Sequence, residues 1–122
     1  MPGMILIVDD EKLLTKTLSN ALREAGYKTA TATTVETAEK QIFSGKDFDV
    51  ILLDNKLVKK SGLDIVRKMR DQDVQAKVIL MTAYDSPEVR SEAKKLKVNR
   101  YVKKPFDLPS MLDIVNEVIE RN

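Results

Sequence analysis

Residues 4–10 read Met-Ile-Leu-Ile-Val-Asp-Asp, and the pattern of this segment recurs along the chain. Met4–Val8 is an uninterrupted apolar run, which is typical of a strand that helices cover on both faces. Two acidic residues, Asp9 and Asp10, follow directly at its carboxyl end. A buried strand that ends in carboxylates indicates a parallel sheet with a functional site at its carboxyl edge.

Further strands and helices alternate through the rest of the chain. Strands are predicted at 28–32, 50–53, 77–82 and 100–103, and helices at 11–25, 33–43, 62–70, 86–96 and from 107 onward. Strict alternation of strand and helix predicts an α/β fold with a parallel sheet and helices on both faces. The right-handed crossovers of such units leave few topologies.

Local signals mark several helix ends. Gly26 stands where a helix C-terminus favours a left-handed residue, and Ser86-Pro87 supplies an N-cap followed by a proline in the first turn. Thr33 and Glu36 have the spacing of a capping box at the start of the second helix. In the first helix, residues such as Leu13, Leu14 and Leu18 are expected to lie mostly in the core.

Composition excludes several classes of protein. The 122 residues fit a single domain, predicted to span 1–122 with a core at about 4–121. The chain contains no Cys and no His, which excludes disulfides, thiolate nucleophiles, serine–histidine triads and imidazole zinc sites. A net charge of +2 is too small to indicate nucleic-acid binding by itself. No apolar run approaches the roughly 18 residues of a membrane span and no leader is recognised, so a cytoplasmic protein is expected.

Polar side chains follow four of the predicted strands: Asp9 and Asp10, then Asp54, Thr82 and Lys104. Because parallel strands end at the same edge of a sheet, these groups are expected to meet there. Clustered carboxylates raise each other's pKa unless a cation joins them, and an oxygen-only cluster suits Mg²⁺. With an ammonium and a hydroxyl beside it, such a cluster can bind a phosphoryl group, and a carboxylate can act as the nucleophile. The sequence therefore predicts phosphoryl transfer onto an aspartate.

Four separate motifs with fixed spacing carry a family resemblance. They are Ile5-Leu6-Ile7-Val8-Asp9-Asp10-Glu11, Leu52-Leu53-Asp54 with Gly62 eight residues later, Met81-Thr82-Ala83-Tyr84, and Tyr101-Val102-Lys103-Lys104-Pro105-Phe106. Together they resemble the receiver domain of response regulators in two-component and phosphorelay signalling, over the whole chain from residue 4 to the last helix. The similarity is closest in character to receivers of the nitrogen-regulation class and to the single-domain relay of the sporulation phosphorelay. It implies a flavodoxin-like (βα)5 doubly wound sheet with strand order 2-1-3-4-5.

The resemblance implies a metal and phosphoacceptor role for the acidic residues. Asp54 would accept the phosphoryl group and also bind Mg²⁺. Asp10 would bind the metal directly and Asp9 through a water molecule. The backbone carbonyl of Lys56 would complete the protein ligands.

It also implies roles for the residues at the fourth and fifth strand ends. Lys104, the Thr82 hydroxyl and the Ala83 N–H would contact the phosphoryl oxygens. Tyr101 would turn inward when Thr82 moves. The Lys104–Pro105 peptide is expected to be cis.

The chain departs from the family pattern at a few positions. Val58 replaces the usual proline, so the loop after the phosphoacceptor is expected to be looser. Lys97-Val98 replaces the usual Gly-Ala, which removes a favourable helix cap. Lys56 and Tyr84 occupy variable positions, and we expect their large side chains to obstruct the in-line water and lengthen the lifetime of the phosphoaspartate.

The resemblance implies particular partners. Because the chain has no histidine, the phosphodonor must be another protein, a sensor histidine kinase or a histidine phosphotransfer protein. The output would be a change in the face formed by the helix at 86–96, the strand at 100–103 and the last helix, read by a downstream effector or a fused output domain. We expect a monomer, or a dimer promoted by phosphorylation through that face, and no direct binding of nucleic acid or membrane. Such a domain catalyses only its own phosphorylation and dephosphorylation, so it is not an enzyme in the ordinary sense.

Part of that face is basic. A solvated surface accounts for it most simply, and a partner surface is the alternative. Its basic residues are Lys94, Lys95, Lys97, Arg100 and Lys103.

Some of the same residues also suit different roles or different classes of protein. Taken singly, Asp9 and Asp10 could cap a helix and Asp54 could begin a turn. A small Mg²⁺-dependent phosphatase of the haloacid-dehalogenase type would need a second aspartate where Lys56 stands. A flavin carrier would need a Ser/Thr/Gly-rich loop after the first strand. A pseudo-receiver would keep the fold without phosphorylation, but the complete set of acids, with Thr82 and Lys104, argues against it.

Overall fold

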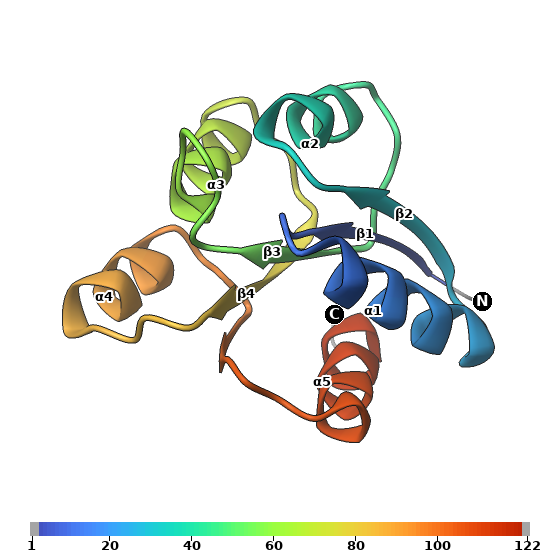
Figure 1. The fold of residues 1–122 in the computed structure, drawn as a ribbon. Helices are drawn as coiled ribbons and strands as arrows, with labels where there is room; N and C mark the ends of the chain where they lie inside the picture. Colours follow the sequence, from blue (N-terminus) through green and yellow to red (C-terminus); the bar gives the residue numbers. More distant parts are fainter. Residues whose placement is uncertain (1–2, 121–122) are drawn as a thin grey trace.

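The computed structural model describes residues 3–120, and its elements follow the predicted alternation. They are β1 (Met4–Val8), α1 (Lys12–Glu24), β2 (Lys28–Ala32), α2 (Val35–Ile42), β3 (Val50–Asp54), α3 (Gly62–Asp71), β4 (Lys77–Thr82), α4 (Pro87–Lys95), β5 (Arg100–Lys103) and α5 (Leu108–Glu120). The strands form one parallel sheet in the order β2-β1-β3-β4-β5 (Figure 1). This confirms the predicted fold class and strand order. The predicted domain limits extend to residues 1–2 and 121–122, which lie outside the described residues.

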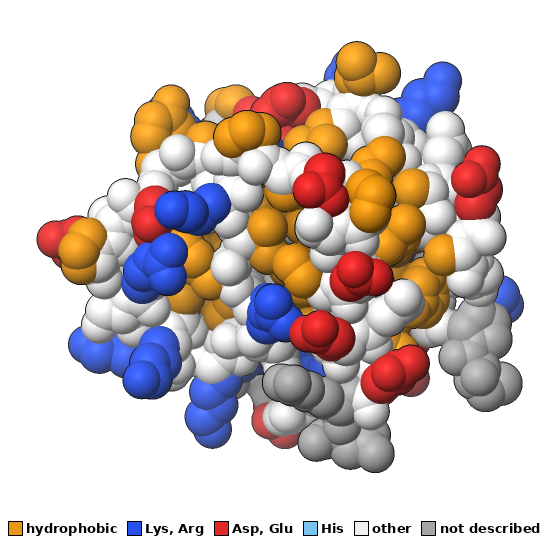
Figure 2. Space-filling view, turned by 90° about the horizontal axis from the view of Figure 1, so that it is seen from below, with side chains coloured by type: hydrophobic (Ala, Val, Ile, Leu, Met, Phe, Trp, Pro, Cys, Tyr) orange, Lys and Arg blue, Asp and Glu red, His pale blue; other side chains and the backbone are white. Residues whose placement is uncertain are grey.

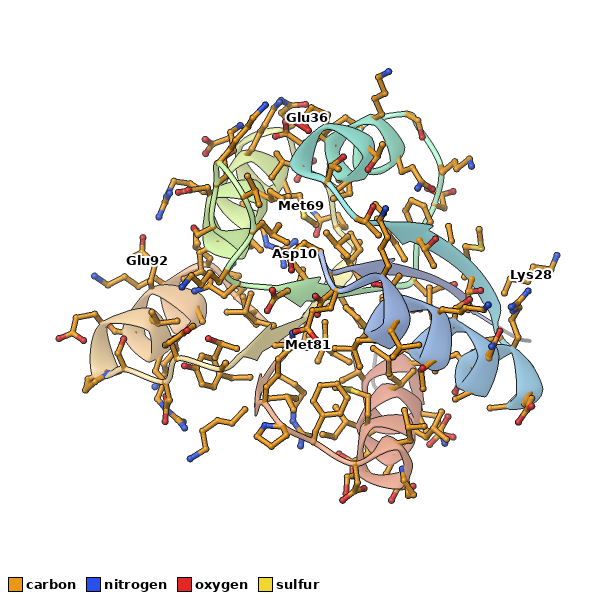
Figure 3. All side chains as sticks on the ribbon, viewed as in Figure 1. Asp10, Lys28, Glu36, Met69, Met81 and Glu92 are labelled. Carbon is orange, nitrogen blue, oxygen red and sulfur yellow. The ribbon has the colours of Figure 1, made fainter. Side chains whose placement is uncertain are left out.

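Each face of the sheet has its own hydrophobic core. Leu6 and Val8 of β1 face α2, α3 and α4, whereas Ile5 and Ile7 face α1 and α5. Met69 of α3 is fully buried in the first core, and Figure 3 shows its side chain inside the molecule. Because helices cover both faces, the central strand β1 is apolar without alternation, as the sequence predicted, whereas the edge strands β2 and β5 carry polar residues. Within the described part of the chain, no helix is both long and apolar enough to cross a membrane.

The N-terminus of α2 differs from the prediction by one residue. The capping box is formed by Thr34 and Thr37, and the predicted pair of Thr33 and Glu36 is wrong. Thr34 has an extended backbone (φ −133°, ψ 159°), and its side-chain oxygen accepts a hydrogen bond from the Thr37 N–H at 3.1 Å. Two adjacent threonines both suit an N-cap, so residue type alone did not distinguish them.

The prediction for α1 was partly wrong. Leu18 is buried and Leu14 is half-buried, but the side chain of Leu13 is exposed (78%). The buried face of α1 passes through Leu18 and Leu22, which are one helical turn apart. Leu13 is five residues before Leu18 and therefore points away from this face. Gly26, just beyond the helix, has φ +101°, which confirms the predicted left-handed cap.

The Arg70 guanidinium links the turn between α4 and β5 to α3. Lys97 occupies the left-handed region (φ 59°) that the usual glycine would adopt without strain. Arg70 of α3 donates hydrogen bonds to the carbonyl oxygens of Leu96 at 3.0 Å and of Lys97 at 3.3 Å. The same side chain donates to the carbonyls of Val74 and Ala76, so it also holds the α3–β4 loop. These contacts help the non-glycine residue keep the left-handed backbone.

Candidate functional site

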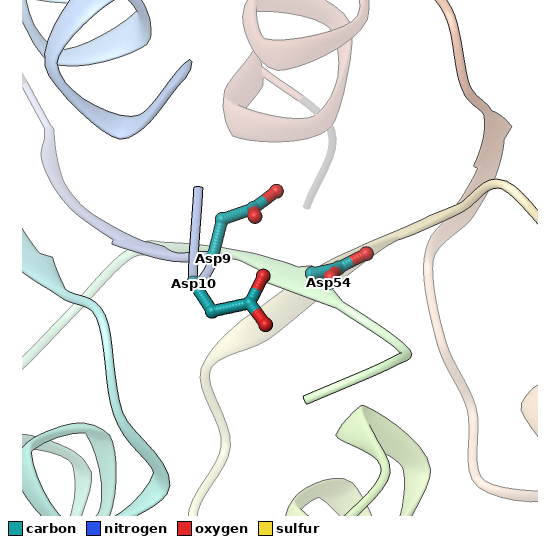
Figure 4. Close-up of side chains that lie close together, drawn as sticks. All are labelled: Asp9, Asp10 and Asp54. Carbon is teal, nitrogen blue, oxygen red and sulfur yellow. The ribbon is translucent and has the colours of Figure 1, made fainter. Parts of the chain in front are cut away.

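Three carboxylates meet at the carboxyl edge of the sheet, where the strand ends predicted them. Asp9 and Asp10 follow β1, and Asp54 is the last residue of the neighbouring strand β3. One oxygen atom from each carboxylate lies within 4.8 Å of the others, and Figure 4 shows the three side chains directed into the same space. Asp9 and Asp54 are buried, whereas Asp10 is exposed. The cluster therefore has a dry base and one open side.

The ammonium of Lys104 balances part of this negative charge. Its Nζ lies 2.6 Å from Asp9 Oδ2 and 3.4 Å from Asp54 Oδ1. Glu11 also contacts it at 3.3 Å, although the sequence indicated no role for Glu11 beyond its place in the first motif. Burial by itself would lower the pKa of Lys104, but the three acids outweigh it and raise the pKa above its usual value. The Lys104–Pro105 peptide is cis, as predicted.

Asp54 occupies a site that disfavours its charged form. Burial, and then the charge of Asp9, raise the pKa of Asp54 to about 6, against the opposing effect of Lys104. The effect of Asp9 on the pKa of Asp54 has the direction expected for neighbouring carboxylates. A nearby cation stabilises the ionised form of a buried acid. This is a physical reason for a metal ion to bind here.

Thr82 and Ala83 lie at the end of β4, beside Asp54. The Thr82 side chain is buried, and its hydroxyl accepts a hydrogen bond from the Tyr84 N–H at 3.0 Å and donates one to the Tyr84 carbonyl at 3.2 Å. Ala83 lines an open cavity of about 420 Å³ together with Asp54 and Lys104. In the structure the Thr82 hydroxyl is therefore bound within its own loop.

Lys56 and Tyr84 meet at the rim of the same cavity. Lys56 Nζ lies 4.4 Å from the centre of the Tyr84 ring, a cation–π geometry, and Tyr84 is largely exposed (63%). The sequence showed two large residues at variable positions but not that they contact each other. Val58, in the same loop, is also largely exposed.

Tyr101 on β5 contacts a residue that no motif had indicated. Its hydroxyl donates a hydrogen bond to Asp85 Oδ1 at 2.9 Å, and its ring is half-buried. Asp85 is three residues beyond Thr82, at a position where the sequence carries no signal of function.

The backbone at Gly62 passes close to the backbone at the end of β3, and this close approach requires a glycine. A Cβ atom at this position would lie 2.5 Å from the carbonyl oxygen of Asp54, a distance that real Cβ atoms do not adopt. Gly62→Ala should therefore lower the free energy of unfolding by about 2 kcal/mol, because the loop carrying Asp54 must shift. Urea denaturation measures this change, and an unchanged midpoint would contradict the close approach.

Comparisons of the sequence with known proteins all indicate the same family. Residues 5–116 match the model of the response regulator receiver domain. The chain is 36% identical over 116 residues to the regulatory protein AtoC of Escherichia coli, covering 95% of this chain and 25% of that protein. It is 32% identical over 119 residues to sporulation initiation phosphotransferase F of Bacillus subtilis, covering 98% of this chain and 95% of that protein. The chain spans about half the length of several other curated relatives.

A solved structure agrees with the fold. The CheY-like receiver domain protein of Methanospirillum hungatei superposes with a TM-score of 0.92 at 25% identity, over 98% of this chain and 95% of that one. Three observations lead to one conclusion. They are the matching fold, the acidic cluster at the carboxyl edge of the sheet, and the family match over most of the chain. This chain belongs to the response regulator receiver domain family of two-component signalling.

Proposed function

We propose that Asp54 accepts a phosphoryl group from a phosphohistidine on a partner protein, in a Mg²⁺-dependent reaction. The observation that carries the proposal is the cluster of three carboxylates within 4.8 Å, with the Lys104 ammonium 3.4 Å from Asp54. The donor set fits the metal, because Mg²⁺ prefers carboxylate and carbonyl oxygens and keeps several waters. Asp9, Asp10, Asp54 and the backbone carbonyl of Lys56 would hold it. When bound, the metal would neutralise charge on the transferring phosphoryl oxygens.

The placement of the side chains supports the following reaction. An oxygen of the Asp54 carboxylate attacks phosphorus, and the phosphorus–nitrogen bond to the donor imidazole breaks, with its electron pair leaving on that nitrogen. Lys104 already contacts Asp54 and would pair with the phosphoryl oxygens. The Ala83 N–H and the Thr82 hydroxyl would donate hydrogen bonds to the same group. For this, Thr82 must release its contacts with Tyr84.

The proposed output is a change in the surface formed by α4, β5 and α5. Movement of Thr82 and an inward turn of Tyr101 would favour a second conformation that exists before phosphorylation. Figure 2 shows that Lys and Arg side chains gather toward the α4 side of the face it views. Of the basic residues expected on the surface of α4, β5 and α5, Arg100 is already paired, since it contacts Glu117 at 2.6 Å.

Several further properties belong to the same proposal. The chain would act as one receiver domain over 1–122, with a sensor kinase or histidine phosphotransfer protein as donor. Its effector would be a separate protein or a fused output domain. Both arrangements are open, because the chain covers 95% of the length of one relative and only 25% of the length of another. A monomer, or a dimer promoted by phosphorylation, and a cytoplasmic location stay predictions.

Intact-mass measurement with acetyl phosphate tests the proposal. With Mg²⁺ the protein should gain the mass of one phosphoryl group, and EDTA should prevent the gain. Absence of any adduct would favour the pseudo-receiver. Sustained hydrolysis of p-nitrophenyl phosphate, with release of many product molecules per protein, would favour the phosphatase instead.

The Lys56–Tyr84 contact is expected to lengthen the lifetime of the phosphoaspartate. Replacing both residues with alanine opens the rim of the cavity to water, so the half-life should fall by about 3- to 10-fold. The decay of the added mass after removal of acetyl phosphate gives this half-life. Lys60→Ala, a lysine of the same loop that pairs with Glu39, serves as the control. An unchanged half-life in the double variant would contradict the role of the contact.

A further inference from the structure

Asp85, in the loop between β4 and α4, contacts both β5 and α4 beside the site. Tyr101 of β5 donates a hydrogen bond to its Oδ1 at 2.9 Å. Arg90 of α4 donates to both carboxylate oxygens, at 2.7 Å from Nε and 3.0 Å from Nη2. Lys103 Nζ lies 3.8 Å from Asp85 Oδ2. The Arg90 guanidinium lies over the Tyr101 ring, 4.6 Å from the centre of the ring. We call these four residues the Asp85 cluster.

The cluster keeps its hydrogen-bond pattern over a wide range of pH. Hydrogen bonds from Arg90 and then Tyr101 lower the pKa of Asp85 to about 2, so its carboxylate is an acceptor at neutral pH. Burial and the contact with Asp85 raise the pKa of Tyr101, so its phenol remains the donor. Hydrogen bonds to an ionised acceptor are stronger than those between neutral groups. Tyr101 is thus fixed at both its hydroxyl and its ring.

The other side of the loop that carries Asp85 borders open space, apart from the contact of Tyr84 with Lys56. The loop from Thr82 to Ser86 borders a second cavity of about 420 Å³, whose other walls include Leu57 and Val89. The Thr82 hydroxyl is held by the backbone of Tyr84, the residue directly before Asp85. A turn of Thr82 toward Asp54 breaks these hydrogen bonds and changes the backbone that positions Asp85. The loop has space to move but is fastened on one side by the Asp85 cluster.

We infer that Asp85 is a positioning residue that holds Tyr101 and the β4–α4 loop in the resting conformation and so opposes phosphoryl binding at Asp54. The inference rests on the proposed function. A contact present in only one of two conformations shifts their populations, and a ligand of the other conformation then binds more weakly. Removal of the Asp85 carboxylate should therefore strengthen binding of a phosphoryl mimic.

Beryllofluoride, measured with Mg²⁺ as a phosphoryl mimic, tests the inference. The dissociation constant of Asp85→Ala should be about 3- to 10-fold lower than that of the wild type, the range that the release of one partly exposed hydrogen bond supports. Tyr101→Phe removes the other partner of the same hydrogen bond. In that background Asp85→Ala should add little, because the hydrogen bond is already lost. Asp47→Ala, at an exposed acid of the α2–β3 loop, should leave the dissociation constant unchanged.

A second readout reports the resting protein without any mimic. The chain has three tyrosines, so a ¹⁹F spectrum with fluorotyrosine contains three signals that Tyr→Phe variants assign. Asp85→Ala should shift the Tyr101 signal and leave that of Tyr27 in place. An unmoved Tyr101 signal overturns the inference, because it shows that Asp85 does not position the ring.

The remaining outcomes separate the inference from the proposed function. Equal dissociation constants for the wild type and Asp85→Ala overturn the inference alone. Fully additive effects of Asp85→Ala and Tyr101→Phe do the same, since they show that Asp85 acts independently of Tyr101. If the wild type binds no beryllofluoride, the proposed function fails, and the role of Asp85 fails with it.

Discussion

An Asp54→Asn protein should gain no phosphoryl mass from acetyl phosphate and Mg²⁺ under conditions that modify the wild type completely. The carboxamide keeps the size of the side chain but lacks the anionic oxygen that attacks phosphorus. Asp9 is buried against Lys104, and Asp10 lies at the exposed side of the cluster, so neither occupies the position of Asp54 at the end of β3. Intact-mass spectrometry of the two proteins side by side makes the measurement.

The matched control for this experiment is Asp47→Asn. Asp47 is exposed in the loop before β3, so the same chemical change there should leave phosphoryl uptake unaffected. An adduct of normal yield on Asp54→Asn would contradict the assignment of the acceptor. Peptide mapping would then identify the acid that carries the phosphoryl group.

The same variant should be more stable than the wild type when metal is absent. At about pH 7.5 with EDTA, Asp54→Asn should raise the free energy of unfolding by about 2 to 3 kcal/mol. The pKa of Asp54 is about 6 in the folded protein and 3.8 for an unperturbed carboxyl. At pH 7.5 the wild type must keep a charged group in a site that favours the neutral one, whereas asparagine is neutral. Each unit between the two pKa values corresponds to about 1.4 kcal/mol.

The pH dependence of this difference has a definite sign. Because the pKa of Asp54 is higher in the folded protein, proton binding stabilises the fold fully below about pH 4, and this stabilisation is lost as the pH rises through 6. The advantage of Asp54→Asn should therefore shrink as the pH falls from 7.5 toward 4. Urea denaturation of both proteins at several pH values measures it, and titrating groups that do not interact with Asp54 cancel in the difference. A difference that does not vary with pH would contradict the raised pKa.

The sequence predicted the parts of the site that depend on strand ends. Asp9, Asp10 and Asp54 could be placed together because parallel strands deliver their final residues to one edge of the sheet. That argument uses only the parallel direction of the strands, which the alternation of strands and helices indicates, whereas the strand order came from the family resemblance. It also placed Lys104 near the acids, although not its particular contacts with Asp9 and Glu11.

The features that the sequence could not predict depend on side chains from distant segments. The Arg70 contacts link α3 to the turn after α4, and the Tyr101–Asp85 hydrogen bond links β5 to the loop before α4. Neither pair has a fixed spacing or a motif, so only their positions in space reveal them. The errors at Thr33 and Leu13 are local, because a shift of one residue changes which side chain caps a helix or faces the core.

The contact between Lys104 and Asp9 joins residues that are 95 positions apart in the chain. During synthesis on the ribosome, the acids of β1 and β3 emerge well before Lys104. A nascent chain that ends before β5 therefore holds three acids at one sheet edge without their counter-charge, and their repulsion opposes closure of that edge. The segment directly after the last strand supplies the Lys104 ammonium, so part of this negative charge is balanced only when β5 docks. Assembly of the site is thus tied to completion of the sheet.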